Sequence, residues 1–409
     1  MEIIRKIQEM QQEMTRWRQK LHAEPELAFE ERATARFLTR QLQSFGIEVH
    51  ALTKTGVIGV LHGKEGPATD TGGRTIMLRA DMDASAIEEK SGVVHTSRTE
   101  GVHHADGHDG HMAMLLGAAK YLAQTRNFNG TVYFVFQPAE ESLDGASEMI
   151  KDGLFSKFPC DEVYALHNVP ELPLGTLASS TGPIMAASDE FHVILTGTGG
   201  HIAHPENTSN LSGAVAEVIT AMNAMLKKEI PAGDPAVMTI SSIVTDSQTA
   251  YDISDTVWLS GSVRGYDTAL HEKLKKNLEQ IIKDTADKYG ATVTLQFKNS
   301  YAPVVNSAAE TNLALEAAKD IVGEDKVLPA PQTLQADDFA RYLQKKPGNL
   351  MEIGTGRANG KTAPAHSAKY DFNDAALPIG ASYWVKLVEK ALPMFGRAPA
   401  PAVPKAPQP

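Results

Sequence analysis

Short apolar runs that alternate with helical patterns are the feature that most constrains the fold of this chain. Residues 75–80, 131–136 and 163–166 have the length and composition of buried strands, and residues 113–122 between the first two have helical spacing. Strands that alternate with helices in this way usually form a sheet with parallel portions, covered by helices. We therefore predict an α/β fold for the first part of the chain.

The pattern changes at about Ser188. From there to residue 298 the expected elements follow the order β-α-β-β-α-β, which is typical of a ferredoxin-like α+β domain. We predict a catalytic domain in two parts, residues 1–187 and 299–396, with an inserted domain over 188–298. The tail, residues 397–409, is almost entirely Ala and Pro, and we expect it to be disordered.

Composition excludes several kinds of partner. The chain has 409 residues and a net charge of −11, which argues against nucleic acid and anionic membranes because both attract basic surfaces. No stretch is apolar and long enough for a transmembrane helix, and the N-terminus does not have the pattern of a signal peptide. The only cysteine, Cys160, excludes an intramolecular disulfide, so we expect a reducing cytoplasm.

Residues 103–111 are the densest group of chemically active side chains. They contain four histidines and two aspartates, with glycines that let the backbone bend so that neighbouring side chains can converge. Imidazole and carboxylate are the usual protein ligands of Zn, Mn, Co and Ni. The alternative interpretation is a solvated polar loop without metal, because short His-rich tracts are only a compositional hint.

Other segments of the chain favour a metal site over a solvated polar loop. Each contains an imidazole or carboxylate that ends or follows an apolar strand or lies in a Gly/Pro loop; they are residues 81–83, 106–108, 137–141, 166–168 and 365–367. A hydrolytic site with two metal ions needs about this many donors, plus one carboxylate that remains free to act as a base. Glu140 and Glu141 could supply one metal ligand and one free base, because adjacent side chains in a strand or tight turn point apart. Paired glutamates are common on surfaces, but these two follow a buried strand and a proline, where idle charge is costly.

At this point the sequence resembles a known family, the dinuclear metallo-amidohydrolases and carboxypeptidases that include aminoacylases, hippurate hydrolase and the plant indole-acetyl-amino-acid hydrolases. The resemblance extends over nearly the whole chain. Its motifs are Arg79-Ala80-Asp81-Met82-Asp83-Ala84, Gly107-His108-Asp109-Gly110-His111, Phe136-Gln137-Pro138-Ala139-Glu140-Glu141 and Gly261-Ser262-Val263-Arg264. It implies a zinc-peptidase-like catalytic domain, with a mixed sheet flanked by helices, and an inserted lid domain that joins two chains in a homodimer.

The resemblance also implies roles at matching positions. Glu140 would be the general base, and Asp83 would orient a metal ligand. His201 would be a lid histidine that reaches across the dimer to polarise the scissile carbonyl, and Arg264 would bind the substrate carboxylate through its guanidinium fork. The implied ligands of one or two divalent ions per subunit (Mn, Zn, Co or Ni) are Asp106, His108, Glu141, His167 and His366.

Two positions depart from the family pattern. Asp106 stands where close relatives place a cysteine ligand; a carboxylate is a harder donor than a thiolate, so we expect better tolerance of Mn, Co or Ni and less dependence on Zn. If Asp106 does not coordinate, one metal site should be weak. Tyr251 replaces an asparagine that lies near the substrate in relatives, which should change the substrate pocket.

These observations predict a metal-dependent hydrolase of a C–N bond that acts on a small molecule. The expected substrate is an N-acyl amino acid or a related small aromatic amide. One alternative is hydrolytic removal of an amino group from an aromatic amine. Another is a metal-binding homologue without activity, although Glu140 argues against it because a pure binder needs no unligated base.

Overall fold

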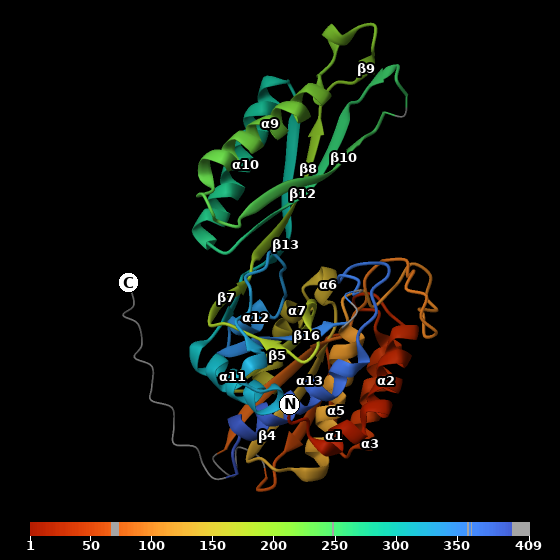
Figure 1. The fold of residues 1–409 in the computed structure, drawn as a ribbon. Coiled ribbons are helices and arrows are strands. Elements are labelled where there is room, and N and C mark those ends of the chain that lie inside the picture. Colours follow the sequence, from red (N-terminus) through yellow and green to blue (C-terminus); the bar gives the residue numbers. More distant parts are fainter. Residues whose placement is uncertain (67–72, 248, 358–359, 361, 395–409) are drawn as a thin grey trace. The chain divides into compact units, whose positions relative to one another are not determined.

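The computed structural model describes residues 1–66, 73–247, 249–357, 360 and 362–394, so the predicted tail lies outside the described residues. The chain forms two compact units (Figure 1). Unit 1 comprises Met1–Gly182, Asn306–Ala330 and the chain from Arg341 onward, and unit 2 comprises Pro183–Val305 and Pro331–Ala340.

The segment 331–340 corrects the predicted boundaries, which placed it in the catalytic domain. Its main chain is bound by unit 2: the Ala186 amide donates to the Gln335 carbonyl at 2.9 Å, and Arg264 donates to the Leu334 carbonyl at 2.9 Å. These bonds join residues far apart in sequence, so no local pattern could have indicated them.

Unit 1 is built on an eight-stranded mixed sheet in the order β1-β2-β4-β3-β5-β16-β6-β15. Four neighbouring strands, β4, β3, β5 and β16, run parallel to one another, as expected for strands whose connections cross over through helices. The strands are β1 (Glu48–Leu52), β2 (Gly56–His62), β3 (Arg74–Asp81), β4 (Gly130–Gln137), β5 (Glu162–Pro173), β6 (Leu177–Ala178), β15 (Val327–Leu328) and β16 (Gly348–Gly356).

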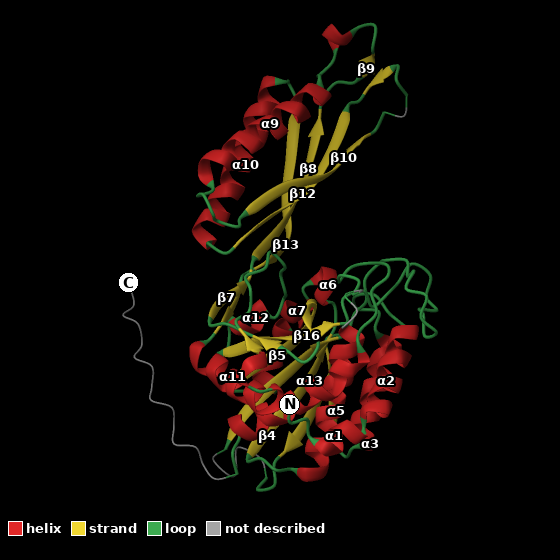
Figure 2. Ribbon diagram, viewed as in Figure 1, coloured by secondary structure: helices red, strands yellow, loops and turns green. Residues whose placement is uncertain are grey.

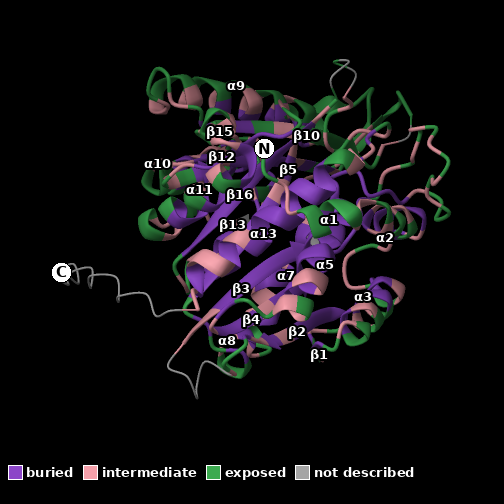
Figure 3. Cartoon of the chain, turned by 60° about the horizontal axis from the view of Figure 1, so that its bottom comes forward, coloured by how far each residue is buried: buried purple, intermediate pink, exposed green. Residues whose placement is uncertain are grey.

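Helices flank this sheet, and α5 and α13 contribute much of the apolar core (Figures 2 and 3). Met112, Leu115 and Leu116 of α5 are fully buried, because this helix packs against β3 on one side and other helices on the rest. The helices of this part of the chain are α1 (Arg5–Glu9), α2 (Gln11–Ala23), α3 (Arg32–Ser44), α5 (His108–Thr125), α6 (Glu140–Leu143), α7 (Gly145–Lys151), α8 (Leu154–Lys157), α11 (Ala308–Val322), α12 (Ala340–Leu343) and α13 (Leu377–Ala391).

Unit 2 has the ferredoxin-like arrangement that its sequence predicts. Four antiparallel strands lie in the order β10-β12-β8-β13, and α9 and α10 pack on them around a separate apolar core. The elements are β8 (Ala187–Thr196), α9 (Leu211–Glu229), β10 (Val237–Thr245), β12 (Thr256–Gly265), α10 (Thr268–Lys288) and β13 (Thr292–Tyr301), with a small pair of strands, β9 (Gly200–His201) and β11 (Asp252–Ile253). At the unit boundary β7 (Gly182–Met185) pairs with β14 (Val304–Asn306).

These two architectures confirm the predicted fold class, an α/β domain with a mixed sheet plus an inserted α+β domain. The sequence did not predict β16, although it lies inside the sheet between β5 and β6. Among the described residues no helix is both long and apolar enough to cross a membrane.

Candidate metal centre

Parallel strands bring the polar segments of unit 1 to one edge of the sheet. β3 ends at Asp81, which is paired across the sheet with Gln137 at the end of β4, and the neighbouring β5 carries His167. The carboxyl ends of such strands are where open α/β sheets form ligand sites. The segments that follow β3 and β4 therefore begin side by side.

Asp106 lies at the centre of the predicted ligands. Its Oδ2 atom is 3.7 Å from Nε2 of His108, 3.3 Å from Nε2 of His167 and 3.6 Å from Nε2 of His366. Nδ1 of His366 is in turn 3.7 Å from Oε2 of Glu141. The structure thus brings together all five residues that the sequence singles out as ligands, while their coordination of an ion stays a prediction.

Two of these imidazoles are held in the orientation that metal ligation requires. Nδ1–H of His108 donates to the Asp83 carbonyl at 2.9 Å, and Nδ1–H of His167 donates to the Asn168 carbonyl at 2.9 Å. A carbonyl can only accept, so in each neutral ring the lone pair is on Nε2, the nitrogen that faces Asp106. Metal-bound histidines usually show this second hydrogen bond to a carbonyl or carboxylate.

The Nε2 atom of His108 is buried and has no hydrogen-bond partner. Buried polar atoms nearly always have one, and an ion is among the recognised explanations when they do not. Nitrogen and carboxylate oxygen donors at these separations fit a divalent transition-metal ion. The site therefore fits the metal that the sequence implies.

Burial and the neighbouring charges shift the pKa values of the two carboxylates in the cluster, Asp106 and Glu141. Burial raises the pKa of Asp106, but the imidazoles of His167 and His108, when they are protonated, outweigh it and hold the pKa well below its usual value. Burial also raises the pKa of Glu141, and the nearby Asp106 raises it further, against the opposing effect of His108. Two buried carboxylates this close repel each other, and a divalent cation between them would remove that repulsion.

Asp83 and Glu31 fix the backbone that leads into the two glutamates. The carboxylate of Asp83 accepts the amides of Glu140 and Glu141 at 2.9 and 3.0 Å, and Glu31 accepts the amide of Ala139 at 3.0 Å. Ala139 has a φ of 59°, a left-handed conformation that non-glycine residues rarely adopt. Three consecutive amides are therefore bound by two buried carboxylates, which hold the strained turn in place.

Asp83 was predicted to orient a metal ligand, and it contacts His108 through its carbonyl and the Glu140-Glu141 turn through its carboxylate. Glu31 was not predicted. Burial raises its pKa to about 7, although the hydrogen bond from Thr55 lowers it. Nothing in its local sequence separates it from the neighbouring Glu30.

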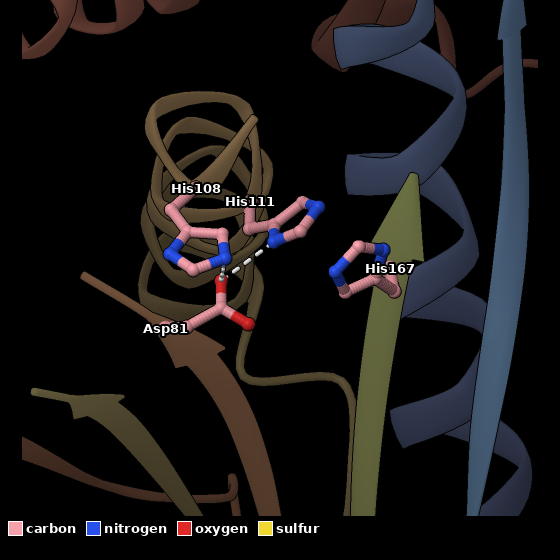
Figure 4. Close-up of side chains that lie close together, drawn as sticks. All are labelled: Asp81, His108, His111 and His167. Carbon is pink, nitrogen blue, oxygen red and sulfur yellow. Dashed lines mark hydrogen bonds and ion pairs between the residues drawn. The ribbon is translucent and has the colours of Figure 1, made fainter. Parts of the chain in front are cut away.

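Asp81 and His111 were also absent from the predicted site, yet they lie beside His108 and His167 (Figure 4). Nδ1–H of His111 donates to Asp81 at 2.6 Å, and its Nε2 accepts the Asn168 amide at 3.0 Å. An amide can only donate, so both nitrogens of His111 are occupied and neither is available to an ion.

The second oxygen of Asp81 accepts the guanidinium of Arg79 at 2.7 Å. Asp81 is therefore already engaged on both oxygens, by Arg79 and by His111. We assign Asp81 and His111 to the support of the cluster, because their donor and acceptor atoms are satisfied by protein groups. The Asn168 amide links this support to β5, the strand that carries His167.

Only glycine fits between Asp106 and His108. Gly107 has a φ of 89°, and a Cβ atom there would lie 2.1 Å from Oδ1 of Asn168 and 2.8 Å from the Tyr370 hydroxyl oxygen. His366 on the opposite loop is also in the left-handed region, with a φ of 57°. Strained backbone of this kind often gathers at functional sites.

The three remaining predicted residues belong to unit 2. His201 is exposed in β9 and is paired with Asp252 of β11, so Tyr251 lies next to it, with its carbonyl accepting the Ile202 amide at 3.0 Å. Arg264 is partly buried on β12 and donates to the Leu334 carbonyl at 2.9 Å. Their roles toward a substrate stay predictions.

Comparison with known proteins decides the family. The model of peptidase family M20/M25/M40 matches residues 77–390. The chain belongs to this family. Hippurate hydrolase of Campylobacter jejuni is 35% identical over 96% of this chain and 100% of its own, and an IAA-amino acid hydrolase of Arabidopsis thaliana is 31% identical over 92% and 84%.

A solved structure also matches. The Bacillus subtilis YXEP protein, described as a dinuclear metal binding peptidase from the M20 family, superposes with a TM-score of 0.76 at 29% identity, covering 93% of this chain and 98% of that one. Together with the curated relatives, it confirms the predicted class: this chain is a metal-dependent hydrolase of an amide C–N bond.

Proposed function

We propose that this protein hydrolyses N-acyl amino acids, releasing the free amino acid and the acyl acid. The observation that carries the proposal is that Asp106 and the other four predicted ligands come together, and that one of them, Glu141, directly follows Glu140 in the turn held by Asp83. Relatives whose names specify hippurate and IAA-amino acids as substrates support the same chemistry, because both are amides of an amino acid.

The residues of this chain have separate roles in the proposed hydrolysis. One or two divalent ions, when bound, make water acidic and stabilise negative charge on the substrate carbonyl. Glu140 accepts a proton from the attacking water and returns it to the leaving amine. Asp83 and Glu31 hold the main chain on either side of Glu140, so that its carboxylate is positioned before substrate arrives.

Three residues of unit 2 complete the proposal. His201 donates a hydrogen bond to the carbonyl oxygen as it gains negative charge. Arg264 binds the carboxylate of the amino-acid part, for which its planar fork of donors is suited. Tyr251, an exposed aromatic residue beside His201, contacts the acyl group and accounts for a preference among acyl groups.

The substrate class can be tested with a panel of small amides and aryl amines. We expect release of free amino acid from benzoyl-, acetyl- and indoleacetyl-amino acids, with kcat/KM about 10- to 150-fold higher than for amides that have no carboxylate, since a charged hydrogen bond contributes about 1.5–3 kcal/mol. Amino acid and ammonia are measured separately. Ammonia release from aryl amines, with no amino acid released from any amide, would contradict the proposal and favour an aminohydrolase.

The Asp106→Cys variant tests the proposed metal preference. A thiolate is a softer donor than a carboxylate, so the variant should bind Zn more tightly relative to Mn than the natural protein does, by about tenfold or more. Metal-stripped protein is titrated with each ion in competition, and Asp106→Asn serves as the control that removes charge without adding sulfur. Equal Zn-to-Mn ratios for the natural protein and the Cys variant would mean that Asp106 is not a ligand.

We further propose that unit 2 joins two chains in a homodimer and that His201 of one chain serves the metal centre of the other. A His201→Ala chain and a Glu140→Gln chain, each inactive alone, are mixed so that subunits exchange. Half of the dimers should be mixed and one of their two sites intact, so activity should return to roughly a quarter of normal. Unmixed samples are the control. No recovery in verified mixed dimers would place His201 in its own chain's site.

The cytoplasmic location expected from the single cysteine stays a prediction.

A further inference from the structure

A second cluster of imidazoles and carboxylates lies in unit 1, away from the five predicted ligands. His22 of α2 meets Glu89 and His103 of the long segment between β3 and α5, and one donor atom from each lies within 4.8 Å of the others. His22 and His103 are fully buried, and the Glu89 side chain is 3% exposed. We propose that these three residues bind one divalent transition-metal ion, distinct from the candidate metal centre.

The distances between the donor atoms fit such an ion. Nε2 of His22 makes a hydrogen bond of 3.2 Å with Oε1 of Glu89, which an ion between these two atoms would replace, and Nε2 of His103 is 3.8 Å from the same oxygen. Donors bound tetrahedrally at about 2.0–2.1 Å lie about 3.3–3.5 Å apart, so small side-chain shifts would complete the geometry.

His22 also has the partner expected of a metal-bound histidine. Its Nδ1 is 2.7 Å from Oδ2 of the buried Asp109, which leaves Nε2 to face Glu89. A carboxylate, a histidine and a metal in sequence form a common support for a bound ion. The same Asp109 oxygen is 3.5 Å from the guanidinium of Arg18, which balances the charge of the carboxylate.

The surroundings of His103 favour a bound ion over a cluster that holds no metal. Without an ion, His22 can be an imidazolium between two carboxylates: burial lowers its pKa, but Asp109 and Glu89 raise it to about 9. That state satisfies His22 and leaves His103 unexplained, because Nε2 of this fully buried residue has no hydrogen-bond partner. An ion ligated by Nε2 of His103 gives this nitrogen a partner.

The ion would have a structural role. The chain from Met82 to Gly107 contains no helix or strand, yet it carries Asp106 and most of it must stay in place for the candidate metal centre to form. Glu89 and His103 lie at separate points of this segment, and His22 lies on a helix. One ion would therefore link two points of the segment to each other and to α2.

Metal content tests the proposal. Metal-stripped protein is saturated with Zn, desalted and counted by mass spectrometry. The His103→Leu variant should hold one ion fewer per chain than the natural protein, whatever number the candidate metal centre holds. The control is His104→Leu: His104 is equally buried and its nitrogens also have no partners, but it belongs to none of the donor groups found among the described residues. It should bind as many ions as the natural protein.

Anomalous diffraction at the Zn edge gives an independent measurement on the natural protein, which does not depend on a variant that folds. A peak between Nε2 of His22 and Oε1 of Glu89, separate from any peak near Asp106, is the expected result. Equal metal content of the natural protein and His103→Leu, or a Zn-saturated crystal without that peak, would overturn the proposal and leave His22 as an imidazolium. Neither result bears on the amide-hydrolase activity.

Discussion

Glu140→Gln should lower kcat by about 10²–10⁴-fold while the fold and the metal content stay intact. Glutamine has nearly the same shape as glutamate but cannot accept the proton of the attacking water. Its main-chain amide still donates to Asp83, as that of Glu140 does at 2.9 Å, so the turn should not change. The measurements are kcat on an N-acyl amino acid, metal content by mass spectrometry and the circular dichroism spectrum.

The neighbouring Glu141→Gln variant is the matched control. Glu141 accepts the Ser85 hydroxyl at 2.5 Å and lies 3.7 Å from His366, inside the cluster of predicted ligands. This variant should lose both turnover and bound metal. The pair separates a base from a ligand, and near-normal turnover of Glu140→Gln with full metal content would remove Glu140 from the role of base.

Removal of the metal should lower turnover by at least about 10²-fold, because bound ions contribute several kcal/mol of charge stabilisation in hydrolysis of this kind. The structure gives the physical reason: the buried Nε2 atom of His108 has no hydrogen-bond partner, and Asp106 and Glu141 place two carboxylates beside it. Stripped protein should regain activity when Mn or Co is added.

Circular dichroism of the stripped protein separates loss of chemistry from loss of fold. A chelator that cannot enter the site gives a false negative, so metal content is measured on the same sample. Stripped protein that contains no metal and still turns over at the normal rate would contradict the assignment of this site. Recovery with Mn that fails in Glu141→Gln would tie the effect to these ligands.

Much of unit 1 could be predicted because its signals are local. The buried strands β3 and β4 are continuous apolar runs, and the polar groups directly follow them. The group of residues 103–111 was visible because ligands and glycines alternate over a few positions, and the family motifs supplied the more distant His366. The ferredoxin-like order of unit 2 could also be predicted from the sequence, since its main strands and helices are long.

β16 shows where local signals fail. It begins and ends at glycine and contains Asn349 and Glu352, residues that are depleted in strands. Distant residues bind the side-chain NH₂ group of one of them: Asn349 donates to Ser179 at 2.8 Å and to Thr311 at 3.1 Å. Burial raises the pKa of Glu352 to about 7, against the effect of His167. Asn349 is therefore tolerated in a central strand through partners that no local window of sequence contains.

By itself, the sequence determined the two architectures, the family and the identity of the residues around Asp106, because residue type and periodicity are properties of neighbouring positions. The tertiary structure alone decided which imidazole nitrogens face that carboxylate. It also showed that Asp81 and His111 satisfy each other and the backbone, and that Glu31 holds the turn before Glu140. The physical reason is that hydrogen bonds between segments far apart in the chain fix each ring and each carboxylate, and such bonds exist only once the chain has folded.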